Sequence, residues 1–294
     1  MKIPNYIPFA GPGCQAPSLE KAKIAILPLC YENAPSYGTG SKYGPLHILE
    51  ASVQLEDFDE EASVELKKLD LYTLEPLFPS DDPSQAISEM KAAAKKILSK
   101  KKFLLCLGGD HAISIGPIEA AAELYQNTGV LQIDAHLDLR DTWNGSRYNH
   151  ACVMRRVVDD IGVPVVQVGI RSFSKEEADL VMQKKFSPFY AHDLVPWDNS
   201  WIQQAIDNLP ENVYLTVDLD GLDPGVIPGT GTPEPGGLLY RQLVDLIQAL
   251  ATRKNVIAAD INELMKIENT HVSEYTAARI ASKILIYCSS TNNS

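Results

Sequence analysis

The sequence predicts an α/β fold: a three-layer α/β/α sandwich around a mostly parallel sheet of about eight strands. Short apolar segments alternate with longer amphipathic segments along the 294 residues. Most of the short segments are apolar throughout, which is typical of strands buried on both faces, and alternating strands and helices indicate a parallel sheet covered by helices. No composition break, low-complexity segment or internal repeat divides the chain, so we expect a single domain over residues 1–294.

The first half of the chain begins with an apolar strand at residues 23–29, which is followed by a helix at 44–52. Asp82-Pro83 opens the next helix, with Asp82 as the N-cap and Pro83 in the first turn. Its last turn is rich in lysine, which suits the negative end of the helix dipole. The other expected elements in this half are strands at 69–73, 102–107 and 129–133 and a helix at 116–125.

The second half continues the alternation after an irregular polar region that follows residue 133. We expect a strand at 212–219 and a last strand at 255–261. Strands at 164–170 and near 189–191 complete a set of eight. We expect the intervening helices at residues 151–160, 175–184, 201–207, 239–252 and 273–288.

Composition limits the classes of partner. A net charge of −12 argues against nucleic acid or an anionic membrane as the main partner. It is compatible with a cationic ligand, or with solubility alone. The five cysteines are scattered without a CxxC pair, which is typical of a reduced intracellular protein. The N-terminus lacks the apolar core of a signal peptide, and no apolar run approaches ~18 residues. We therefore expect a cytoplasmic protein.

Acidic and histidine side chains follow three of the expected strands. They are Gly108-Gly109-Asp110-His111, Asp134-Ala135-His136-Leu137-Asp138 and Asp218-Leu219-Asp220-Gly221. Ligands bind outside the carboxyl ends of parallel strands. In an extended chain, residues at i, i+2 and i+4 point the same way. We therefore expect four carboxylates and two imidazoles to converge there.

This set of side chains predicts a metal centre. Carboxylate with imidazole and no thiolate suits Mn²⁺ better than structural zinc, and six ligands are too many for one ion, so a two-metal cluster is expected. Taken singly, His111 is equally well a capping or core histidine, and a DxD pair is commonplace. The occurrence of all three segments at strand ends favours the metal site.

A non-catalytic nucleotide- or metal-binding module is the alternative from a different class. Gly108-Gly109 resembles a phosphate-binding loop, but the sequence contains no GxGxxG and no GK[ST] motif. Asp110 directly after the glycines would repel phosphate. An acidic cluster without basic residues is expected to bind cations.

These segments resemble those of the ureohydrolase family, which includes arginase and agmatinase. The resemblance covers nearly the whole chain, and includes Ser36-Tyr37-Gly38-Thr39-Gly40 and the glycine-rich loop at residues 229–237. It implies two Mn²⁺ ions per chain and a homotrimer or homohexamer. By position, one ion would be bound by His111, Asp134, Asp138 and Asp218, and the other by Asp134, His136, Asp218 and Asp220, with Asp134 and Asp218 bridging.

The resemblance also implies catalytic roles. A hydroxide bridging the metals would attack the guanidinium carbon of a small cationic substrate, and Asp220 would pass a proton to the leaving amine. His150 would exchange protons with solvent, and Glu263 would pair with the guanidinium group. From the residues alone, His150 could instead cap the helix that follows it, and Glu263 would be taken for a solvated acid.

Within the family, the sequence is more similar to agmatinases than to arginases, which predicts hydrolysis of agmatine to putrescine and urea. Ser172 stands where arginases have an aspartate near the substrate's amine. Arg147 is the counter-argument, because it could bind a carboxylate and favour guanidinobutyrate; arginine is the other alternative. Asn149 replaces a usual serine, and Met265-Lys266 replaces a usual Asn-Pro. These departures bear on substrate preference.

Overall fold

The computed structural model describes residues 6–289, within which eight strands form one sheet with every pairing parallel. The strand order is β4-β1-β5-β10-β9-β6-β7-β8. The strands are β1 (Ile24–Leu29), β4 (Leu71–Thr73), β5 (Phe103–Gly108), β6 (Thr128–Ile133), β7 (Val165–Ile170), β8 (Phe189–Tyr190), β9 (Asn212–Asp218) and β10 (Asn255–Asn262). The predicted fold class is confirmed.

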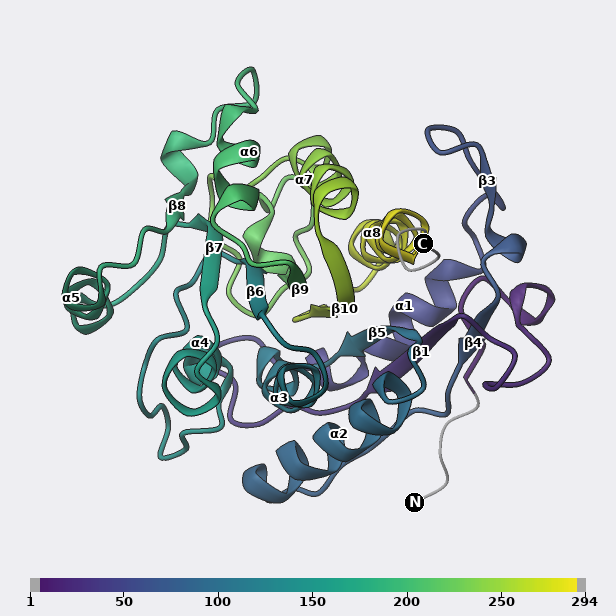
Figure 1. The fold of residues 1–294 in the computed structure, drawn as a ribbon, viewed down its shortest axis with the longest axis horizontal. Helices are drawn as coiled ribbons and strands as arrows, with labels where there is room; N and C mark the ends of the chain where they lie inside the picture. Colours follow the sequence, from purple (N-terminus) through teal and green to yellow (C-terminus); the bar gives the residue numbers. More distant parts are fainter. Residues whose placement is uncertain (1–5, 290–294) are drawn as a thin grey trace.

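Helices cover both faces of this sheet (Figure 1). One face packs against α1 (Gly44–Ser52), α6 (Ser200–Asp207), α7 (Tyr240–Arg253) and α8 (Val272–Ser289). The other packs against α2 (Pro83–Leu98), α3 (Ile115–Leu124), α4 (Val153–Arg156) and α5 (Lys175–Lys184). Among residues 6–289, the helices are all too short or too polar to cross a bilayer.

The sheet is buried on both faces, as the apolar segments predicted. All six residues of β5 are buried, and they alternate between the two cores: Phe103 and Leu105 face one, Leu104 and Cys106 the other. β10 lies between β5 and β9, and β6 follows β9. Since these four strands are parallel, their carboxyl ends meet at one edge in the middle of the sheet.

The helix expected at residues 151–160 is instead a composite. It starts as a 3₁₀ turn at His150–Cys152, continues as α4 and ends as a π-helical turn at Val157–Ile161. Gly162 has a φ of 78° and its N–H donates to the carbonyl of Val157 at 2.9 Å. This left-handed glycine closes the wide last turn.

A second, two-stranded sheet lies outside the main one and was not anticipated. β2 (Phe58–Asp59) and β3 (Val64–Glu65) form an antiparallel hairpin. Lys283 of α8 is 1% exposed, and its Nζ lies 2.7 Å from a carboxylate oxygen of Asp59 and 2.7 Å from one of Glu61. The hairpin is thus tied to α8 by a buried ion pair.

Candidate metal centre and active-site pocket

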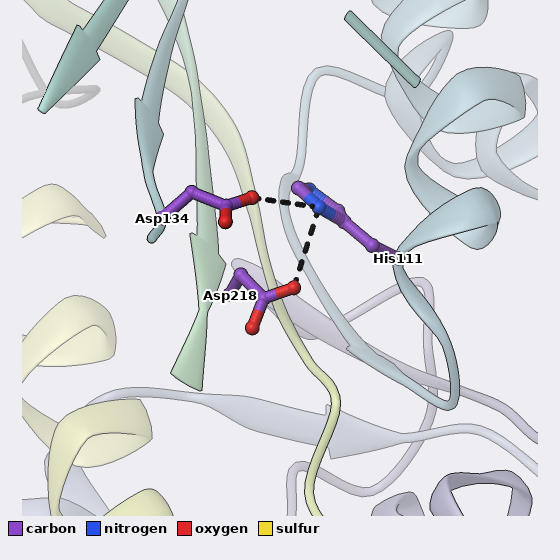
Figure 2. Close-up of side chains that lie close together, drawn as sticks. All are labelled: His111, Asp134 and Asp218. Carbon is purple, nitrogen blue, oxygen red and sulfur yellow. Dashed lines mark ion pairs between the residues drawn. The ribbon is translucent and has the colours of Figure 1, made fainter. Parts of the chain in front are cut away.

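The carboxyl ends of β5, β6 and β9 bring the predicted ligands together. His111 Nδ1 lies 3.1 Å from Asp134 Oδ2, 2.9 Å from Asp138 Oδ2 and 3.4 Å from Asp218 Oδ2. Figure 2 shows the His111 ring with Asp134 and Asp218 pointing toward it. All four side chains are buried, and His111, Asp134 and Asp218 form a compact group that could hold an ion.

A second group shares Asp134 with the first. His136 Nδ1 lies 3.1 Å from Asp220 Oδ2 and 3.5 Å from Asp134 Oδ1. Asp134, His136 and Asp220 therefore form another candidate ligand set. The two oxygens of Asp134 face different imidazoles, which is the arrangement expected of a bridging carboxylate. For Asp218, the geometry shows membership of the first group, and bridging by it stays a prediction.

Backbone amides hold these carboxylates in place. Asp134 Oδ1 accepts from the N–H of His136 at 2.6 Å, and Asp218 Oδ1 accepts from the N–H of Asp220 at 2.9 Å. Asp138 has a φ of 52°, in the left-handed region that is uncommon for non-glycine residues. Such strain collects at functional sites because the surrounding structure maintains it.

The residues fit a pair of cations. His111 Nδ1 is buried and has no hydrogen-bond partner among residues 6–289, although three carboxylate oxygens surround it. Burial and the neighbouring Asp134 raise the pKa of Asp138 to about 7. Burial, Asp220 and Asp134 raise the pKa of Asp218 well above its usual range. Carboxylates packed this closely need compensating positive charge, and oxygen and imidazole donors suit Mn²⁺.

A cavity of about 320 Å³ opens above this cluster. The cluster contributes His136, Asp138, Asp218 and Asp220 to its wall. The other lining residues come mainly from loops that follow strands; they include Pro35, Ser36, Tyr37, Gly38, Arg140, Trp143, His150, Ser172, Phe173, Gly231, Thr232 and Glu263. A small molecule in this cavity would therefore touch the acidic cluster at one end and loop side chains elsewhere.

Glu263 follows β10 and lies in the cavity wall, not in solvent. Its Oε1 accepts from the backbone N–H of His111 at 2.7 Å, which connects it to the first ligand group. Its φ of 66° is also left-handed. Burial, reinforced by Asp110, raises the pKa of this carboxyl well above its usual range. A cation in the cavity would favour the ionised form.

His150 also faces the cavity. Its Nε2 lies 2.8 Å from Ser36 Oγ, which accepts at 3.0 Å from Trp143 Nε1. Burial lowers the pKa of His150 to about 4, with His111 and His136 adding to the effect. The ring is therefore neutral at physiological pH. Asn149, not His150, caps the helical segment, because its Oδ1 accepts from the N–H of Ala151 at 3.1 Å.

Comparison with known proteins identifies the family of this chain. The profile of the Arginase family matches residues 22–287. The chain belongs to the arginase family. As a ureohydrolase of that family it is a hydrolase. It is 39% identical to an N(1)-aminopropylagmatine ureohydrolase from Synechocystis, over 92% of this chain and 90% of that one.

This arginase-family protein is also similar to a protein named agmatinase and to a solved structure of an agmatine ureohydrolase. It is 30% identical to an agmatinase from Pyrococcus horikoshii, over 89% of this chain and 90% of the relative. The crystal structure of the agmatine ureohydrolase of Thermoplasma volcanium superposes with a TM-score of 0.86 at 30% identity, covering 94% of this chain and 92% of that one. The eight-stranded fold is therefore shared with the family.

The two glycines before Asp110 have a packing role in this arginase-family protein. A Cβ on Gly109 would lie 1.8 Å from the carbonyl oxygen of Tyr31, and one on Gly108 would lie 1.9 Å from Asn262 Oδ1. Only glycine fits where β5 ends against its neighbours. The resemblance to a phosphate-binding loop therefore has a structural explanation.

Arg147, considered from the sequence as an anchor for a substrate carboxylate, lies away from the cavity, whereas Arg140 lines it. Arg147 donates to both carboxylate oxygens of Asp160, at 3.1 and 3.2 Å, and does not line the cavity. Arg140 does line it, with its guanidinium 4.1 Å from the centre of the Trp143 ring.

The turn Trp143-Asn144-Gly145-Ser146 has positive φ at Asn144 and Gly145, which is typical of a type I′ turn.

The substitutions noted beside the site also have structural roles. Asn149 is buried, and its Nδ2 donates to the carbonyls of Asn33 and Ala34, which joins the loop before Ser36 to the helical segment. Met265 lies against Gly38, where a Cβ would be 2.7 Å from its sulfur. Both residues shape the cavity wall through the loop at 33–38.

Sequence reasoning missed several residues around the cluster. Gln132 Nε2 donates to Asp134 Oδ2 at 2.7 Å, and Thr232 Oγ1 donates to Asp220 Oδ2 at 3.2 Å. Gln132 precedes Asp134 by two positions, so it shares its face of β6. A polar residue at i−2 from a ligand, within an otherwise apolar strand, was the signal that could have found it.

Proposed function

We propose that this chain is a binuclear Mn²⁺ ureohydrolase that hydrolyses agmatine to putrescine and urea. The observation that carries the proposal is the pair of ligand groups sharing Asp134 beneath a cavity that also contains Glu263. Six carboxylate and imidazole side chains surround the proposed metal sites: His111, Asp134, His136, Asp138, Asp218 and Asp220. When bound, two Mn²⁺ ions supply positive charge that acidifies a coordinated water.

The chain's own residues would handle the substrate and its protons. Glu263 pairs with the guanidinium group through charge-assisted hydrogen bonds. Water adds to the guanidinium carbon, and the bond from that carbon to the substituted nitrogen breaks to release urea and the amine. Asp220 transfers the proton that the leaving amine needs. His150, neutral and hydrogen-bonded to Ser36, exchanges protons with solvent.

Agmatine is favoured over substrates that carry a carboxylate. Arg147 pairs with Asp160 outside the cavity, which removes the expected anchor for guanidinobutyrate. Ser172 donates to Glu234 Oε1 at 2.9 Å, and no aspartate stands at that position for an arginine's amine. Arg140 lines the cavity wall, but it is already stacked on Trp143 and lies 3.8 Å from a Glu177 oxygen.

N(1)-aminopropylagmatine is a second candidate substrate. The supporting observation is that a 39% identical relative and a 34% identical relative from Thermus thermophilus are both named for that activity. This substrate shares the guanidinium group and adds an aminopropyl arm. The same catalytic residues would act on it, and the cavity loops would accept the longer amine.

The test is a urea-release assay on Mn²⁺-reconstituted protein. Agmatine, N(1)-aminopropylagmatine, arginine and guanidinobutyrate are compared by kcat/KM, and bound Mn²⁺ is measured in the same preparation. We expect about two ions per chain, as a two-metal site requires, and the highest kcat/KM with agmatine. A higher value with the aminopropyl compound would select the second candidate. Full activity without metal would refute the mechanism.

We propose that the enzyme is cytoplasmic and assembles as a homotrimer or homohexamer. The support is its reduced-cysteine composition and its membership of the family. Sedimentation velocity of the purified chain distinguishes the two assemblies, and a stable monomer would contradict both.

A further inference from the structure

A buried network of polar side chains lies behind His111, on the side opposite the ligand cluster. His111 Nε2 lies 2.9 Å from Thr216 Oγ1, while Nδ1 faces the three carboxylates. Thr216, Asp260 and the neighbouring Asn262 are all 0% exposed, and none of them lines the cavity. A carboxylate buried this deeply costs free energy unless hydrogen bonds compensate it.

The pairing of β9 with β10 brings the side chains of this network together. Asp260 of β10 is the register partner of Thr216 of β9, so the two side chains are neighbours on one face of the sheet. Tyr214 Oη donates to Asp260 Oδ2 at 2.7 Å, and Asn262 Nδ2 donates to Asp260 Oδ1 at 2.7 Å. Burial raises the pKa of Asp260, and hydrogen bonds from Thr216, Tyr214 and Ser114 oppose that rise.

The neighbours of Thr216 indicate the direction of the hydrogen bonds. Thr216 has one hydroxyl proton, and its Oγ1 lies 3.4 Å from both Ser114 Oγ and Asn262 Nδ2. We assign that proton to the strand neighbour Asp260, because a carboxylate can only accept. Thr216 Oγ1 must then accept from His111, so the imidazole proton is on Nε2. In the neutral ring this leaves the lone pair on Nδ1, the buried nitrogen that has no hydrogen-bond partner in the described part of the chain.

We propose that Asp260 is a positioning residue of the metal centre, which acts through Thr216 to hold His111 as the Nε2–H tautomer. Nδ1 is thereby available to the ion bound with Asp134, Asp138 and Asp218. The opposite tautomer would put a proton on Nδ1 and would leave Thr216 without a proton to give Asp260. This inference rests on the proposed metal site, and it adds a determinant of metal affinity that makes no contact with the ion.

The test measures Mn²⁺ affinity by following free Mn²⁺ with electron paramagnetic resonance during a titration. Thr216→Val keeps the side-chain shape and removes the hydroxyl. We expect it to weaken one of the two Mn²⁺ sites by about 10- to 100-fold, the usual effect of removing a group that orients a ligand. Thr216→Ser retains the hydroxyl and should restore the affinity to within about threefold of the wild type.

Two further variants separate positioning from packing. Asp260→Asn keeps the size of the side chain and should weaken the same site, which also covers the case in which Thr216→Val does not fold. Tyr214→Phe is the matched control, because it removes a hydrogen bond to the same carboxylate but leaves Thr216 and His111 in contact. It should lower the thermal midpoint and leave Mn²⁺ affinity within about threefold, since the ligand's orienting bond is intact.

The outcomes separate this inference from the proposed function. A wild-type protein that binds no Mn²⁺ would refute the proposed function and the inference together. A wild type that binds two ions while folded Thr216→Val and Asp260→Asn bind them equally well would overturn the inference alone. Equal weakening by Tyr214→Phe and Thr216→Val would show that the network acts by packing, and would also overturn it.

Discussion

Replacing Glu263 with glutamine isolates its charge from its structural role. The Glu263 Oε1 that accepts from the His111 N–H at 2.7 Å has an equivalent in the glutamine amide oxygen, so the left-handed backbone and this contact are kept. The other oxygen loses its negative charge. A hydrogen bond to a charged group contributes about 1.5–3 kcal/mol, so kcat/KM for agmatine should fall about 10- to 150-fold, at 1.36 kcal/mol per factor of ten.

The assay is urea release under saturating Mn²⁺, with bound metal measured alongside. Glu263→Gln should retain its Mn²⁺, because Glu263 belongs to neither ligand group. Glu263→Ala should lose more activity, since it also leaves the buried His111 N–H without an acceptor, at a cost of about 1–3 kcal/mol. A kcat/KM within twofold of the wild type would refute the pairing of Glu263 with the guanidinium. Loss of Mn²⁺ would reassign the residue to the metal site.

Three more predictions follow from the same contacts. Asp134→Asn should lose more Mn²⁺ than His136→Asn, because Asp134 belongs to both ligand groups; equal metal contents would refute bridging. Mn²⁺ affinity should increase with pH. Burial lowers the pKa of His136, but Asp220 and Asp134 outweigh burial and raise that pKa to about 12 in the metal-free protein, so Mn²⁺ binding must release the His136 proton. A Mn²⁺ affinity that does not change with pH would contradict this. Lys283→Met should lower the free energy of unfolding by at most about 3–5 kcal/mol, because the buried Asp59 loses its nearer cation while Arg279 stays 3.6 Å away. Urea denaturation measures the loss, and adding Asp59→Asn should recover part of it.

Residues just after the strands were predictable because the apolar strands before them are easy to recognise. The segment Asp134-Ala135-His136 needed only a strand before it and alternation within it to place two ligands on one side. His111 was predictable for a similar reason, since it lies three residues after the end of an apolar strand. The two ligand groups assemble because parallel strands end at the same edge, whichever helices connect them.

Residues in loops were not predictable in the same way. Arg147 and Arg140 flank the same irregular region, and their directions depend on Asp160 and Trp143, which no periodicity relates to them. The hairpin at residues 58–65 was missed because its two-residue strands carry no pattern. Its anchor, Lys283, is more than 200 residues away along the chain, and in the sequence it reads as an ordinary helix lysine.

The cavity has two parts of different origin. The acidic floor comes from the ends of the central strands, whereas much of the wall comes from the loops that contain Tyr37, Trp143 and Phe173. Substitutions in those loops can alter the size of the accepted amine without touching a ligand group. Changes in the loop sequences alone, whether natural or engineered, can therefore alter which guanidino substrates are accepted, while the residues that carry out the hydrolysis stay the same.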